Sequence, residues 1–87
     1  MGERRELAKK IADYLIKTGT ESTTNGSWIV YFNEIEDEFD VDVDRELVDR
    51  VVDCLNPEIV ADVYSDDFCF DMVFYLDYCP NLEEGEV

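Results

Sequence analysis

The spacing of apolar positions predicts a helix at the start of the chain. Residues 3–18 carry four apolar residues on one helical face: Leu7, Ile11, Tyr14 and Leu15. Gly19 follows at the position that a C-terminal cap prefers, so we expect the helix to end there. The polar stretch 20–27 then predicts a loop, because it combines Asn, Gly, Ser and Thr without apolar residues.

A short strand and a short helix are expected next. The segment WIVYF, residues 28–32, is aromatic and β-branched, which is typical of a strand. Asn33 is expected to cap a helix over about 34–39, with Glu36 three residues later as its capping-box partner.

The middle of the chain holds the clearest amphipathic helix. We expect a connector over residues 40–43 and an N-cap at Asp44. The helix then runs to residue 55 on five apolar positions: Leu47, Val48, Val51, Val52 and Leu55. Asn56-Pro57 ends it, since a residue before proline is disfavoured in a helix.

The C-terminal part predicts a β-hairpin, with strands at 59–65 and 68–76 around Asp66-Asp67. One face of the second strand is wholly apolar and consists of Phe68, Phe70, Met72, Phe74 and Leu76. The opposite face is only partly polar. The pattern therefore indicates either a strand covered on both sides or an apolar face that awaits a partner.

These elements predict a small α+β domain in the order α-β-α-α-β-β with a C-terminal β-hairpin. We expect one domain over residues 1–82 and a flexible acidic tail over 83–87. The element order resembles that of winged-helix proteins. That resemblance implies that the third helix stands where DNA would be read and that the hairpin stands where a wing would touch the DNA backbone.

Charge changes this interpretation. The chain has 87 residues, is 46% hydrophobic and has a net charge of −16, so it is too apolar for a disordered acidic tail. Residues 1–17 carry five basic and three acidic residues. The rest of the chain carries 20 acidic residues and two basic ones, Arg45 and Arg50. Such asymmetry is informative about partners.

Several chemistries are excluded by what the chain contains. It has no histidine, no Gly-rich phosphate loop and no C-x-x-C pair, so we expect no enzyme, no zinc site and no cofactor. Cys54, Cys69 and Cys79 are expected to be buried, reduced thiols. The N-terminus lacks the apolar stretch of a secretory signal and no apolar run could span a membrane, so we expect a cytoplasmic protein.

The aspartates of the connector resemble part of a calcium loop. Asp40, Asp42 and Asp44 stand at the first, third and fifth positions of an EF-hand. The sixth position needs Gly and the twelfth needs Glu, but Arg45 and Val51 stand there. We therefore expect no metal site.

The third helix and the hairpin tip have the wrong sign for binding DNA, because affinity for nucleic acid comes from cations at phosphates. Carboxylates on a rigid domain can instead occupy a groove lined by Arg and Lys. In size and charge the chain is similar to small acidic DNA-mimic proteins of phages and mobile elements, of the anti-CRISPR or restriction-inhibitor type. That resemblance implies a stoichiometric inhibitor of a basic nucleic-acid-binding protein or complex, such as a CRISPR effector, without direct binding of nucleic acid. The expected partner-binding residues are Glu36, Asp37, Glu38, Asp40, Asp42, Asp44, Glu46, Asp49, Asp53, Asp66 and Asp67.

Two alternatives stay open at this point. The acidic residues can form a solvated surface that only keeps the protein soluble. The domain can also be an interaction or dimerisation module that uses the aromatic residues of the hairpin face and its surroundings: Trp28, Tyr64, Phe70, Phe74, Tyr75 and Tyr78.

Overall fold

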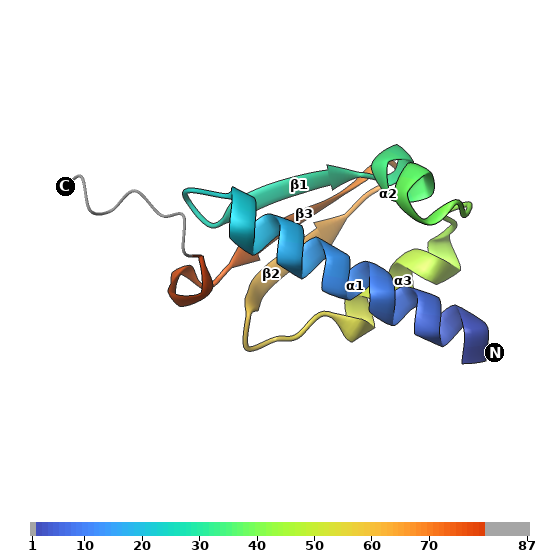
Figure 1. Cartoon of the computed structure of the whole chain (residues 1–87), viewed down its shortest axis with the longest axis horizontal. Coiled ribbons are helices and arrows are strands. Elements are labelled where there is room, and N and C mark those ends of the chain that lie inside the picture. The colour runs from blue at the N-terminus through green and yellow to red at the C-terminus, as the bar shows by residue number, and fades with distance from the viewer. Residues whose placement is uncertain (1, 80–87) are drawn as a thin grey trace.

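A computed structural model describes residues 2–79, with side chains described from residue 5 onward. The elements are α1 (Gly2–Ser22), β1 (Ser27–Tyr31), α2 (Phe32–Phe39), α3 (Arg45–Cys54), β2 (Val60–Ser65), β3 (Cys69–Phe74) and a 3-10 turn, η1 (Leu76–Tyr78) (Figure 1). The predicted small α+β domain and its element order are confirmed. The tail predicted over 83–87 lies outside the described residues.

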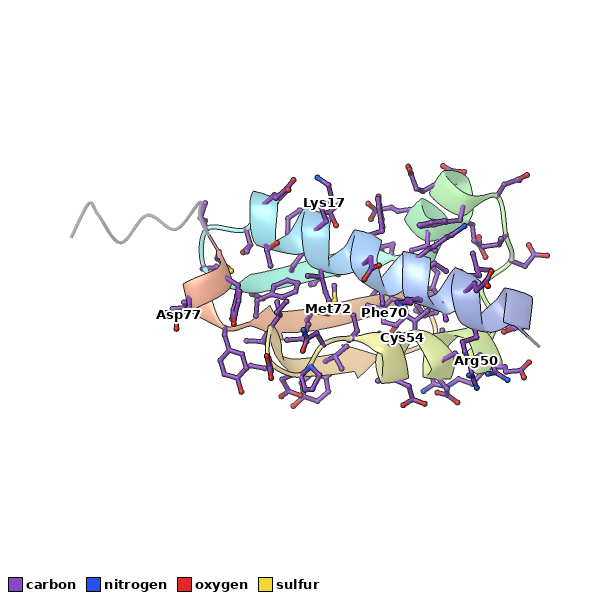
Figure 2. All side chains as sticks on the ribbon, turned by 60° about the horizontal axis from the view of Figure 1, so that its bottom comes forward. Lys17, Arg50, Cys54, Phe70, Met72 and Asp77 are labelled. Carbon is purple, nitrogen blue, oxygen red and sulfur yellow. The ribbon has the colours of Figure 1, made fainter. Side chains whose placement is uncertain are left out.

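The three strands form one antiparallel sheet in the order β1-β3-β2, so β3 lies in the centre. Helix α1 crosses one face of this sheet, while α2 and α3 lie toward the end of the molecule where α1 begins (Figure 1). We call the face toward α1 the inner face. Phe70, Met72 and Phe74 of β3 are buried on it, and Figure 2 shows Phe70 and Met72 between α1 and the sheet.

The apolar row predicted for the second hairpin strand is therefore only partly correct. Phe68 and Leu76 lie beyond the ends of β3 and are exposed. The predicted aromatic patch is also divided between two sides. Trp28 packs against the core together with Phe70 and Phe74, whereas Tyr64, Tyr75 and Tyr78 are exposed.

Helix α1 supplies much of the core against the sheet and α3. Its buried residues recur at helical spacing. They are Ala8, Ile11, Ala12 and Leu15, and they join Val30, Ile35, Leu47, Val48, Val51 and the inner residues of β3 in one cluster. Within the described residues, no helix is long and apolar enough to cross a membrane.

The predicted end of α1 at Gly19 is wrong, because the helix continues to Ser22. The N–H of Thr23 donates to the carbonyl of Gly19 over 2.9 Å, as in a continuing helix. The glycine is instead required by packing. A Cβ placed on Gly19 would overlap the ring of Phe74 and lie 3.2 Å from Cδ1 of Trp28. Gly19 thus lets α1 approach the sheet closely.

The capping box at the start of α2 is predicted at Asn33 and Glu36, but it lies two residues earlier, at Tyr31 and Glu34. The helix begins at Phe32, and the N–H of Tyr31 donates to the Glu34 carboxylate over 3.1 Å. The chain enters the helix early because the backbone N–H of Phe32 donates to Phe68 O (2.7 Å) and its ring packs edge-on against Phe70. Asn33 therefore lies inside the first turn instead of before it.

The prediction for α3 is confirmed within a residue at each end, including the Asp44 cap described below. The thiols differ from expectation. Cys79 is buried, but Cys54 and Cys69 are only half-buried, and all three are unpaired.

Replacing Gly19 with alanine is expected to destabilise the fold. Elsewhere in a helix this change would stabilise by about 0.5–1 kcal/mol, but here the methyl group meets the buried Phe74 ring. We expect a net loss of about 1–3 kcal/mol in the free energy of unfolding, measured by urea denaturation. Ser22→Ala, at an exposed position of the same helix, is the control and should change little. An increase in stability for Gly19→Ala would refute the close packing.

Candidate binding surface

The connector between α2 and α3 is held in place by two carboxylates. Oε2 of Glu36 accepts from the N–H of Val43 over 3.0 Å, and Oδ1 of Asp44 accepts from the N–H of Leu47 over 2.8 Å. The second bond is the predicted N-cap, which satisfies a donor that the first turn of α3 would otherwise leave open. Glu36 and Asp44 therefore stabilise the connector and the start of α3 in the protein by itself.

Asp40 turns the chain out of α2. It has φ 56° and ψ 50°, in the left-handed region, and its N–H donates to Glu36 O over 2.8 Å. Aspartate tolerates this conformation better than most residues. After this turn Asp42 faces solvent, while Val41 and Val43 pack against the core.

A concave surface lies between the connector, the start of α3 and the tip of the hairpin. It consists of two neighbouring hollows, of about 330 and 110 Å³, that share Phe32, Val43 and Asp67 in their lining. We call this surface the acidic groove. Its carboxylates are Glu36, Asp44, Asp66 and Asp67, and Arg45 is the one cation among the described residues that line it.

The floor of the acidic groove is apolar. Phe32, Val43 and Val48 line its narrower hollow, and Tyr31 and Phe68 line the wider one. An apolar floor with carboxylates at the rim suits the side chain of arginine or lysine, whose methylene stem packs on apolar atoms while the charged end pairs with oxygen.

Asp66 organises the tip of the hairpin. Its Oδ1 accepts from the N–H of Phe68 (2.7 Å) and of Cys69 (2.9 Å). These two bonds lower the pKa of the Asp66 carboxyl below its ordinary 3.8, and the bond from Phe68 has the larger effect. Asp67 is exposed and makes no hydrogen bond or ion pair with a described residue. Asp66 thus shapes the tip, and Asp67 offers its charge to solvent.

The outer face of α3 is less negative than the sequence suggested. Nε of Arg45 lies 3.4 Å from Oδ1 of Asp49, and Nη2 of Arg50 lies 3.4 Å from Oε2 of Glu46. The Arg45–Asp49 pair is exposed and Arg50 of the second pair is partly buried. Such surface pairs contribute little to stability, but they neutralise part of the helix. Asp53 makes no ion pair with a described residue.

The predicted site residues therefore divide among several regions. Four of them line the acidic groove, and Glu36 also borders a larger hollow of about 580 Å³ with Asp40 and Asp42 on the other side of the connector. Asp37 and Glu38 are exposed on α2, and Glu46, Asp49 and Asp53 lie on α3. Sequence reasoning missed the apolar floor, because Phe32 and Phe68 had been assigned to strands.

The described residues show no arrangement of three or more His, Cys, Asp or Glu side chains that could hold a metal ion. The hollows of the groove, of about 330 and 110 Å³, are at or below the lower end of the range for small-molecule pockets. Comparisons with protein-family models, with curated proteins and with solved structures found no match.

Two substitutions at Asp44 distinguish its role as the cap of α3 from the effect of its charge. Asp44→Ala should cost about 1 kcal/mol in the free energy of unfolding because the Leu47 N–H loses its acceptor. Asp44→Asn keeps an oxygen at this position, so it should unfold close to the wild type in thermal denaturation while lacking the charge. Equal destabilisation by both changes would contradict the capping role.

The titration of Asp66 tests the hairpin tip. Its folded-state pKa is lowered, so the stability it contributes is present above the unfolded-state pKa and is lost as pH falls through the folded-state value. NMR titration of the side-chain carboxyl should give a pKa below 3.8. The stability difference between wild type and Asp66→Ala should shrink as the pH falls through that range. A pKa at or above 3.8 would refute the bonding.

Proposed function

We propose that this protein is a DNA mimic that inhibits a basic nucleic-acid-binding protein by occupying its groove. The observation that carries the proposal is the acidic groove. In a domain with winged-helix element order, it lies between α3 and the hairpin tip, where such proteins meet DNA, and it is lined by Glu36, Asp44, Asp66 and Asp67.

The fixed positions of the carboxylates support this function. Two backbone bonds orient Asp66, and Glu36 and Asp44 are each bonded to a backbone N–H. A partner that pairs with them meets acceptors already in place, so it loses less entropy on binding than it would with free side chains. Guanidinium groups that normally bind phosphate pair well with such oxygens.

Charge also supports a protein partner over nucleic acid. A net charge of −16 repels a duplex. Association with a basic protein would be fast and would weaken with salt. We place this partner among DNA-binding complexes such as CRISPR effectors in the cytoplasm, and we assign the protein no catalytic role and no cofactor.

Charge reversal at two exposed acids tests the proposal. Asp53 and Asp67 are suitable because neither makes a hydrogen bond or ion pair with a described residue, so changing them leaves the fold intact. Asp53→Lys with Asp67→Lys should weaken inhibition by about tenfold or more, because like charges would then face the partner. The assay is displacement of a fluorescent DNA duplex from a purified CRISPR effector, after capture from host lysate has identified which complex binds.

The matched control is Glu6→Lys with Asp13→Lys on the exposed face of α1, which changes the net charge equally. It should retain inhibition within about twofold, since long-range attraction alone is screened at physiological salt. Equal effects of both pairs would show that only bulk charge matters. Binding that survives both Asp53→Lys with Asp67→Lys and 0.5 M salt would refute mimicry.

A further inference from the structure

The sheet has a second face that no described element covers. Side chains alternate along a strand, so the residues between the buried ones on β1 and β3 point away from α1. Ile29 and Tyr31 of β1, Val73 of β3 and Tyr64 of β2 are each at least 40% exposed on this side. We call it the open sheet face, and in Figure 1 it is the side of the sheet turned away from α1.

A carboxylate lies in the centre of the open sheet face. Asp71 stands on the central strand, opposite Ile29 on one side and Tyr64 on the other. It is half-buried, and within the described residues it makes no hydrogen bond or ion pair. A carboxylate between an aliphatic and an aromatic side chain has lost part of its water without gaining a cation.

A second carboxylate lies beside an aromatic side chain on the same face. Asp62 stands next to Tyr64 on the same side of β2. A hydrogen bond and charge from Asp62 raise the pKa of the Tyr64 hydroxyl, and the charge of Asp71 adds to the shift. None of the three strands contains Lys or Arg, so nothing within the sheet balances Asp62 and Asp71.

The negative charge of the open sheet face distinguishes between the molecules that could bind to it. A second copy related by two-fold symmetry would set two identical acidic faces against each other, which costs free energy. Nucleic acid is repelled for the same reason. A protein surface with an arginine among apolar residues is complementary to this face, because arginine pairs with carboxylates and stacks on tyrosine rings.

We propose that the open sheet face is a binding surface for a basic protein segment that places an arginine on Asp71, between Ile29 and Tyr64. Aliphatic neighbours of that arginine would cover Val73 and Tyr31. Tyrosine and arginine are the residue types that contribute most to such interfaces. This inference does not depend on the proposed function, because the central contact is made by Asp71, Ile29 and Tyr64, which do not line the acidic groove; Tyr31 alone borders both surfaces.

The test uses the full chain labelled with nitrogen-15 and two blocked pentapeptides, Val-Arg-Leu-Arg-Val and Val-Gln-Leu-Gln-Val. Titration is followed by amide chemical shifts. The arginine peptide should shift the amides of Ile29, Tyr64 and Asp71, and the glutamine peptide should bind about tenfold more weakly or not at all.

Substitutions then test which residues of the sheet contact the arginine peptide. Asp71→Asn and Tyr64→Ser should each weaken binding at the sheet by about tenfold, while their thermal unfolding stays close to wild type because both side chains point outward. Asp67→Asn makes the same charge change as Asp71→Asn but lies in the acidic groove, so it should alter binding at the sheet less than twofold.

Four results would overturn the inference. They are equal binding of both peptides, shifts confined to the acidic groove, no shift at millimolar peptide, and a dimer in sedimentation that Tyr64→Ser abolishes. The last result would identify a second copy as the occupant. Inhibition that is retained by Asp53→Lys with Asp67→Lys, together with peptide binding at the sheet as expected, would instead count only against the proposed function.

Discussion

The close approach of α1 to the inner face of the sheet is the contact on which the rest of the structure depends. Three short strands carry too little apolar surface to be stable alone, and a helix on one face supplies the missing burial. Gly19 permits this approach above Phe74. Since α1 also packs on α3, the same contact sets where α3 and the connector stand, and hence where the acidic groove forms.

Covering only one face of the sheet has a second consequence. The outward residues of β1, β2 and β3 have no helix of the described chain to pack on, so Ile29, Tyr64 and Val73 remain exposed beside Asp62 and Asp71. The molecule thus presents two surfaces of different character. The acidic groove combines carboxylates with a narrow apolar floor, and the open sheet face sets a single central carboxylate among larger apolar side chains.

Two groups stand out among the acidic residues. Glu34, Glu36, Asp44 and Asp66 accept hydrogen bonds from backbone N–H groups at helix starts and turns, so the fold itself requires an acceptor there. Others make no hydrogen bond or ion pair with a described residue: Asp37, Asp42, Asp53 and Asp67. Self-repulsion among the residues of this second group lowers the stability of the folded state.

Local patterns in the sequence were enough for the element order and for the Asp44 cap, because helix periodicity, strand alternation and capping act between near neighbours. The role of Gly19, the start of α2 at Phe32 and the division of the aromatic residues between two faces were decided by tertiary contacts. Phe32 bonds and packs with the hairpin, and Gly19 meets Phe74, more than 30 residues away in each case. Periodicity shows which residues share a face, but only packing between distant segments decides which face is covered.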